Sequence, residues 1–467
     1  MSPSSSPAAR PTGEPGPHPG DRGGAAPSGT GRTGARAEWD PLEEVLIHQP
    51  GIEMFFGLLE PYSFLYERAF RIDEATYEHG ALEHALTEAG VTVRHLIHLA
   101  IEIGTRRPEL VEEVRRQALR LVRYSGPREM VDRARAALRH NLDRFDGPTL
   151  FNILLLRPSV RLERHPGERA IWPKVVLDTP LANLYFMRDQ QALTPRGFVL
   201  GRMAKPQRRN EPRLTGALLR AWGADVAAEI RAPGTFEGGD FLPLGEFALL
   251  GTGDRTNASA VRQILAAPIG FDEVAVVHQP SHPAIPGDDP DPMIDMHLDT
   301  YLNIPGRGLA VGCDALLRRA RVDVYRRHGR APLRLEPGHP MLHDYLTAKR
   351  FEIVNISTLE QLSYASNFLC VRDRQILAVE VDQEVDQVLR TLREAATTDP
   401  HRYRALYALA RKERETLREQ NDFFPHKTAL REAGVTAIPL ALREITGGYG
   451  GAHCMTCAVN RRPTASA

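Results

Sequence analysis

The chain has 467 residues, of which 42 % are hydrophobic and 25 % charged, and its 59 basic and 59 acidic side chains give a net charge of +0. This is the composition of a globular protein with enough apolar material for a large core. The balanced charge gives no reason to expect nucleic acid or an anionic membrane as a partner, but it leaves a small charged substrate and homo-oligomerisation open. No stretch approaches the roughly 20 apolar residues of a membrane span.

The first elements along the chain are a polar tail, a strand and a helical region. Residues 1–37 are rich in Pro, Gly, Ser and Ala, so we expect a disordered tail. Order is expected to begin at Glu38, and EVLIH predicts a strand that ends before Pro50. Residues 98–149 carry apolar residues at helical spacing among many Arg and Glu, which predicts an all-helical insertion with solvated charged faces.

A repeated plan follows the insertion: a polar cluster, a strand, a short turn and a second strand. Four segments with this plan begin at Asn183, Phe236, Met296 and Ser366, and GGAHCMTCAV near the C-terminus repeats the first half. Helical patterns such as TGALLRAWGA lie between them. The repeat predicts an α/β fold of five ββαβ modules that close around a pseudo-fivefold axis as a five-bladed α/β propeller. Residues 38–97 and 150–467 would form this catalytic propeller.

Such a closure would bring the polar clusters together at the axis. The set contains a thiol, a histidine beside carboxylates, and more acid than base. Its members are Asn183, Arg188, Asp189, Glu237, Asp240, His297, Asp299, Asn367, His453 and Cys454.

The cysteines indicate the compartment and one reactive thiol. Four cysteines, two of them Cys313 and Cys370, are too few to cross-link this chain, and MSPSSSPAAR lacks the apolar core of a secretory signal. We therefore expect a reducing, cytoplasmic location. Cys454 and Cys457 form a C-x-x-C pair, but no helix and no second pair follow, which argues against redox or zinc use. In a strand, residues three apart face opposite sides, so Cys454 would face the axis while Cys457 packs.

The acids and the thiol together point to a guanidinium substrate. Several carboxylates around a thiol raise its pKa, but a bound guanidinium matches carboxylates bidentately and its charge favours the thiolate. The thiolate of Cys454 can then attack the central carbon of the guanidinium. His297 can protonate the departing nitrogen and afterwards take a proton from water. No metal or other cofactor is expected in this chemistry.

The motifs NLYFMRD, FEGGDF, MHLDT and GGAHCMTC resemble, in order and spacing, the arginine deiminases of the guanidine-modifying superfamily. The resemblance runs from about Glu38 to the end, and it implies the five-bladed propeller with a helical insertion after the first module. It also implies a hydrolase of carbon–nitrogen bonds in linear amidines, with Cys454 as nucleophile, His297 as general acid and base and Glu237 as its support.

The same resemblance implies substrate contacts. Asp189 and Asp299 would bind the guanidinium beside the ring of Phe186. Further residues that would bind the amino-acid head group or order the site are Asp240, Arg208 and Arg255, and the polar clusters add Asn183 and Asn367.

Two departures concern the substrate. Tyr449 stands among the glycines where the family usually has an arginine, and YER at Tyr66–Arg68 replaces an acidic stretch. Because that arginine helps to hold the substrate carboxylate, Tyr449 predicts weaker binding of free arginine. The substrate could accordingly be L-arginine or an arginine derivative.

Other reactions use the same site. DTYLNI and HCMTCAVNRR are similar to the arginine:glycine amidinotransferase branch, in which an amine intercepts the covalent intermediate. An arginine dihydrolase, which removes two ammonias, is a variant of the hydrolase. A non-catalytic binder of guanidino compounds is disfavoured because it needs no thiol.

Overall fold

The computed structural model describes residues 33–106, 108–164, 167, 171–287, 291, 294–329 and 331–464. The predicted tail lies outside the described residues as far as position 32. The prediction of disorder is wrong for residues 33–37, because Gly34 forms a β-bridge with Asn460 and Ala37 forms one with Leu244. Ala35 is buried as well. Small side chains let this segment lie against two sheet edges, although its composition resembles that of a tail.

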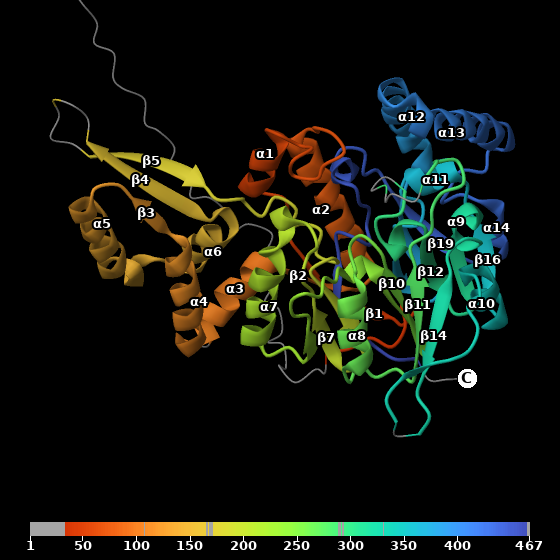
Figure 1. The fold of residues 1–467 in the computed structure, drawn as a ribbon, viewed down its shortest axis with the longest axis horizontal. Coiled ribbons are helices and arrows are strands. Elements are labelled where there is room, and N and C mark those ends of the chain that lie inside the picture. The colour runs from red at the N-terminus through yellow and green to blue at the C-terminus, as the bar shows by residue number, and fades with distance from the viewer. Residues whose placement is uncertain are drawn as a thin grey trace, which may run out of the picture. The chain divides into compact units, whose positions relative to one another are not determined.

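Five sheets share the predicted plan, an antiparallel strand pair whose second strand also pairs in parallel with a third (Figure 1). Four of them follow chain order: β6 (Gln191–Thr194), β7 (Gly197–Leu200) and β8 (Val226–Glu229); β9 (Phe241–Leu244), β10 (Phe247–Thr252) and β11 (Glu273–His278); β12 (Leu302–Gly306), β13 (Leu309–Gly312) and β16 (Glu352–Asn355); β17 (Leu369–Arg372), β18 (Gln375–Val379) and β19 (Thr436–Leu440). In addition, β14 (Val322–Arg326) and β15 (Arg334–Leu335) extend the second of these.

The fifth sheet joins the two ends of the described chain. β1 (Leu42–Ile47) pairs in parallel with β2 (Thr92–His95) and antiparallel with β20 (Cys457–Arg461). The last strand therefore completes the first module. These mixed sheets with helices between their strands confirm the α/β class.

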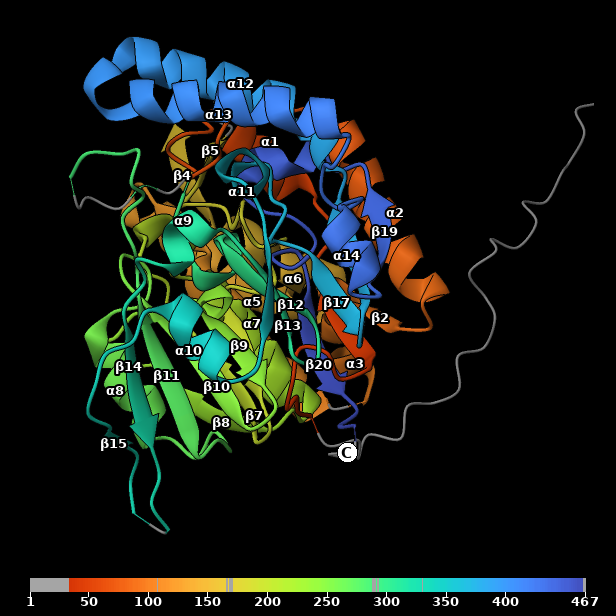
Figure 2. The same cartoon turned by 90° about the vertical axis from the view of Figure 1, so that its right-hand side faces the viewer.

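Helices connect the second and third strand of each module. They are α1 (Ile52–Leu58), α2 (Ile72–Glu88), α7 (Glu211–Trp222), α8 (Ala258–Ala266), α9 (Asp314–Leu317), α10 (Leu342–Ala348), α12 (Val381–Thr398), α13 (Pro400–Gln420) and α14 (Thr428–Glu432), with α11 (Thr358–Leu362) before β17. Figure 2 shows α12 and α13 lying side by side as a long antiparallel pair. Strands such as β9 and β13 are buried along their whole length, as is typical of sheets covered on both faces. No helix among the described residues is long and apolar enough to cross a membrane.

The insertion after the first module is not all-helical. Its helices are α3 (Leu96–Arg106), α4 (Pro108–Leu121), α5 (Arg128–His140) and α6 (Gly147–Leu156). A sixth sheet joins them, in which β3 (Arg123–Ser125) pairs with β4 (Pro158–Arg164) and β4 pairs with β5 (Ile171–Leu177). Most of β5 is exposed. Its sequence, IWPKVVL, does not alternate between apolar and polar residues, which is the pattern that predicts a half-buried strand. The insertion thus continues beyond residue 149.

The glycines of Glu237-Gly238-Gly239-Asp240 let two modules approach each other. A Cβ atom at Gly238 would lie 2.2 Å from the carbonyl oxygens of both Arg188 and Gln191. The Gly238 N–H donates to the Asp189 carbonyl at 2.9 Å. Only a residue without a side chain permits this contact, which places Glu237 next to Asp189.

We therefore expect Gly238→Ala to destabilise the fold by about 3 kcal/mol, because the methyl group meets backbone that cannot move aside. Gly80→Ala on α2 is the matched control, since a Cβ there meets nothing within 4 Å and should stabilise the helix by about 0.5–1 kcal/mol. Urea denaturation measures both. Equal stability of the two variants would contradict the close contact.

Candidate active site

The predicted polar clusters do converge, and each lies just before or at the start of a module. Asp189 precedes β6, Glu237 precedes β9, His297 precedes β12, Asn367 precedes β17 and Cys454 precedes β20. All five side chains are buried. Residues from five separate segments thus form one site.

Cys454 is held by Asn367 and lies near Asp299. Asn367 Nδ2 donates to Cys454 Sγ at 3.1 Å, and Asn367 Oδ1 accepts the N–H groups of Cys454 at 3.1 Å and Gly451 at 2.8 Å. Asp299 Oδ2 lies 3.8 Å from Cys454 Sγ. Burial raises the pKa of Cys454 well above its usual value, and Asp299 and Asp189 raise it further. The free site therefore favours the neutral thiol.

Cys454 does not lie in a strand, contrary to the prediction. It belongs to a turn at residues 452–455, and β20 begins only at Cys457. Cys457 pairs with Leu46 of β1, and burial raises its pKa to about 11. Both thiols are free, and they occupy different surroundings. Cys454 is thus held by Asn367 in a turn, whereas Cys457 packs in β20 against β1.

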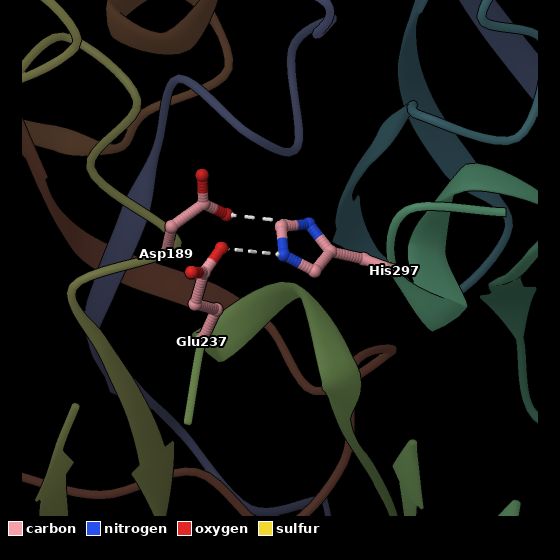
Figure 3. A group of neighbouring side chains, drawn as sticks. All are labelled: Asp189, Glu237 and His297. Atoms are coloured by element: carbon pink, nitrogen blue, oxygen red, sulfur yellow. Dashed lines mark hydrogen bonds and ion pairs between the residues drawn. The ribbon is translucent and has the colours of Figure 1, made fainter. Parts of the chain in front are cut away.

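His297 points its imidazole ring at two carboxylates, those of Asp189 and Glu237, which lie on the same side of the ring (Figure 3). Its Nε2 is 2.9 Å from Glu237 Oε2 and its Nδ1 is 3.8 Å from Asp189 Oδ1. Burial lowers the pKa of His297, but the charge of Asp189 and the hydrogen bond to Glu237 outweigh it and raise the pKa to about 9. Burial likewise raises the pKa of Glu237, but Arg255 and His297 outweigh it and lower the pKa to about 2. At neutral pH the site therefore holds an imidazolium that faces two carboxylates.

These three side chains could also be considered as metal ligands, since their ligand atoms lie within 4.8 Å of one another. Two arginines argue against this use. Arg208 Nη1 donates to Asp189 Oδ2 at 2.6 Å, and Arg255 Nη1 lies 3.7 Å from Glu237 Oε2. Both positive charges would repel a divalent cation, whereas they are compatible with proton transfer by His297.

The carboxylates of Asp189 and Asp299 each keep one oxygen free of hydrogen bonds. Among the described residues, Asp189 Oδ1 and Asp299 Oδ1 are buried and have no hydrogen-bond partner. The other oxygen of Asp299 lies 2.7 Å from His453 Nδ1. Buried carboxylate oxygens are normally paired, so these two mark where N–H donors of a ligand would bind.

Arg208 forms an ion pair with Glu211, an acidic residue that the sequence did not predict to belong to the site. Its Nε and Nη2 donate to Glu211 Oε2 at 3.0 Å and 2.9 Å, and its guanidinium lies 5.9 Å above the ring of Phe186. Burial raises the pKa of Glu211 to about 7 against the lowering charge of Arg208. Glu211 opens α7, where an acidic residue is common at helix starts, so the sequence offered no distinct signal.

A cavity at the centre contains most of the predicted residues. Its lining includes Asn183, Phe186, Asp189, Arg208, Arg255, His297, Tyr449 and Cys454, together with Leu65, Met296 and Gly448. Glu237, Asp299 and Asn367 contact its lining residues from behind. Asp240 also lies behind the cavity, where it accepts the N–H of Leu298 at 3.0 Å. Burial raises the pKa of Asp240 to about 6.

The cavity measures about 10 Å³, which is room for about one water molecule. An arginine side chain is larger, so its entry requires movement of the rim. Tyr449 is one of the partly exposed lining residues, with Leu65 and Met296, and its backbone is left-handed, with φ 72°. Leu65, at φ 66°, faces the same cavity and was not predicted.

The two departures from the family motifs adjoin each other. The N–H of Glu67 donates to the carbonyl of Gly447 at 2.8 Å, so the YER segment packs against the glycine run that carries Tyr449. Glu67 also accepts the hydroxyl of Tyr364 at 2.9 Å. The two unusual segments therefore contact each other, and Tyr449 lines the cavity.

Comparisons with known proteins identify relatives of this chain. The family model described as arginine deiminase matches residues 62–461. The arginine deiminase of Halobacterium salinarum is 28 % identical over 92 % of this chain and 96 % of its own length, and that of Limosilactobacillus fermentum is 26 % identical over 57 % and 66 %.

Among solved structures, the amidinotransferase SxtG from Microseira wollei superposes with a TM-score of 0.48 at 14 % identity, over 93 % of this chain and 99 % of its own. DDAH from Pseudomonas aeruginosa gives a TM-score of 0.46 at 15 % identity, over 89 % and 99 %. Because the family model extends over most of the sequence, from Tyr62 to Arg461, this chain belongs to the arginine deiminase family.

Proposed function

We propose that the protein hydrolyses the guanidino group of L-arginine, or of an arginine derivative, to a ureido product and ammonia. For arginine the product is citrulline. The observation that carries this proposal is that Asp189 Oδ1 and Asp299 Oδ1 are buried without a hydrogen-bond partner, while the Asp299 carboxylate lies beside the Cys454 thiol and Asp189 lines the same cavity as Cys454. A guanidinium supplies the planar N–H donors that these oxygens lack. Membership of the arginine deiminase family supports the same substrate.

Substrate charge activates the nucleophile in this proposal. The free site disfavours the Cys454 thiolate, because two carboxylates and burial raise the pKa of the thiol. A guanidinium bound between those carboxylates cancels their charge and lowers the pKa. The N–H of Asn367, which points at Cys454 Sγ, then stabilises the anion.

The covalent steps follow from these positions. The Cys454 thiolate attacks the guanidino carbon and forms a C–S bond. Protonated His297 donates its proton to a terminal nitrogen, the C–N bond breaks and ammonia leaves, so an S-alkyl thiouronium remains on Cys454. Neutral His297 then takes a proton from water, and the hydroxide adds to the same carbon. The C–S bond breaks as the added hydroxyl loses its remaining proton to solvent, which releases the neutral ureido product and the thiolate.

We further propose that the five modules surround one axis as a five-bladed α/β propeller. Two observations support the closure: β20 completes the first module, and residues that precede five different strands meet in one cavity. The catalytic body would then comprise the modules, with the mixed insertion packed on it beside α7.

Amidino transfer is the second candidate, because the DTYLNI and HCMTCAVNRR segments are similar to an amidinotransferase branch. An assay with L-arginine, with and without glycine, distinguishes the two by measuring ammonia, citrulline and ornithine. We expect equal amounts of ammonia and citrulline, unaffected by glycine. Ornithine formed only with glycine would indicate transfer, whereas two ammonias for each ornithine would indicate a dihydrolase.

A further inference from the structure

A large groove lies apart from the catalytic cavity, between the insertion and the second module. Its volume is about 940 Å³, and it shares no lining residue with the cavity at Cys454. The end of α4, β3 and the residue before β4 form one wall, and α7 with the segments around it forms the other. Figure 1 shows the insertion beside α7, and α3 contacts α7 directly. This volume lies within the usual range of pockets for small organic ligands.

The lining is strongly positive. Eight of its residues are arginines and one, Glu229, is acidic. Glu229 is already engaged, because its Oε2 lies 2.5 Å from Arg220 Nη2. The whole chain has a net charge of +0, so this concentration is local and does not reflect a generally basic surface.

Several of these arginines lack acidic partners. Arg209 donates to the carbonyl of Ala204, and Arg213 donates to Asn210 Oδ1, both of which are neutral. Among the described residues, no carboxylate lies within 4.0 Å of either guanidinium. The two arginines therefore present positive charge to the groove without compensation.

Like charges also face each other across the groove. Arg123 and Arg157 come from the insertion, whereas Arg213 comes from α7. Burial lowers the pKa of Arg157, Asp178 raises it, and the charges of Arg123 and Arg213 lower it further. Arg157 Nη2 lies 4.0 Å from Asp178 Oδ2, so one carboxylate only partly offsets this repulsion. An anion between the walls would remove it.

The base of the groove is apolar. Leu154, Leu200, Leu214 and Ile230 line it and are buried. A ligand that fits would combine an apolar or planar part with anionic groups that reach both walls. Guanidinium groups match phosphate oxygens bidentately, and a chain of two or more phosphates can engage more of these arginines than one phosphate can.

We propose that this groove binds a small organic polyphosphate, a molecule with two or more phosphate groups and an apolar ring, of the class of nucleoside triphosphates. The phosphates contact Arg157 and Arg213 from opposite walls, and the ring lies against Leu200 and Leu214. The concave shape and limited volume favour a small molecule over an extended nucleic acid.

The groove also adjoins a segment that holds the catalytic site. Arg209 and Asn210 line the groove, and they directly follow Arg208, which donates to Asp189. A ligand that draws Arg209 towards the groove therefore also moves Arg208, whose guanidinium donates to Asp189. We expect occupancy to change the KM for arginine, a consequence that rests on the proposed function, whereas the binding itself does not.

Isothermal titration of the full chain with ATP, tripolyphosphate and inorganic phosphate tests the binding. We expect ATP and tripolyphosphate to bind, inorganic phosphate to bind at least about tenfold more weakly, and affinity to fall as salt rises. Arg157→Glu and Arg213→Glu should each weaken ATP binding at least about tenfold. The matched control is Arg404→Glu, an exposed arginine on α13, which should bind as the parent does.

Other outcomes would overturn the assignment. No heat with any polyphosphate, or unchanged affinity in both groove variants, would exclude the site. An RNA oligonucleotide that binds more tightly than ATP and competes with it would reassign the groove to nucleic acid. Thermal melting of each variant shows that it is folded, and the more conservative Arg213→Gln should lose affinity in the same direction.

Steady-state kinetics test the link to the catalytic site. ATP should change the KM for arginine in the parent protein and in Arg404→Glu, but not in Arg213→Glu. A KM that stays constant while titration shows bound ATP would refute the link and leave the binding site standing. An inactive protein that still binds ATP would contradict the proposed function alone.

Discussion

Replacement of Cys454 by alanine is expected to reduce the kcat for arginine by at least about 10³-fold, whereas Cys457→Ala should retain nearly full activity. The reason is position, since Cys454 lines the cavity beside Asp189 and His297 while Cys457 packs in β20 against β1. Each change removes one buried thiol group and leaves a methyl group, so Cys457→Ala is a matched control. Its loss of stability should be about 1 kcal/mol.

The measurement is kcat at saturating arginine, together with thermal melting of both variants. Mass spectrometry of acid-quenched enzyme adds a direct readout, because turnover should leave a covalent adduct on the parent protein and none on the Cys454→Ala protein. Equal loss of activity in the two folded variants would refute the assignment of the nucleophile.

Activity should fall as pH rises through about 9, because His297 must be protonated to release ammonia and its pKa is about 9. The same shift affects stability. A histidine whose pKa rises from 6.5 to about 9 on folding stabilises the native state fully below pH 6.5, and this contribution is lost as pH rises through 9. His297→Gln should lower kcat by about 10²–10⁴-fold.

Glu237→Gln provides the sharper test. It keeps the shape and a hydrogen-bond acceptor for His297 Nε2 but removes one of the charges that raise the pKa of His297. The falling limb of the kcat profile should therefore move to lower pH. A limb that stays at the same pH in this variant would show that another group controls it.

The chemical groups of the site were predictable because they lie together in short segments of the sequence. His297 and Asp299, or Glu237 and Asp240, stand within four residues of each other, and glycines mark close backbone contacts. The repeat of these segments predicted the plan of the sheets, which the strand pairing confirms. The local sequence was less informative in two places. The exposed strand β5 lacks the alternation of apolar and polar residues that predicts a strand, and the small residues around Gly34 and Ala35 have the composition of a disordered tail although they pair with a sheet.

The sequence by itself determined the family, the α/β class, the chemistry of a thiol, a histidine and carboxylates, and the guanidinium as the group they suit, because each depends on residue types at fixed short spacings. Only the tertiary structure decided which oxygens of Asp189 and Asp299 stay unpaired and that Glu211 supports Arg208. It also decided that Arg157 and Arg213, far apart in the chain, face one groove. Such features depend on contacts between distant segments, and hydrogen bonding, burial and charge repulsion act through distance in space rather than through order in the chain.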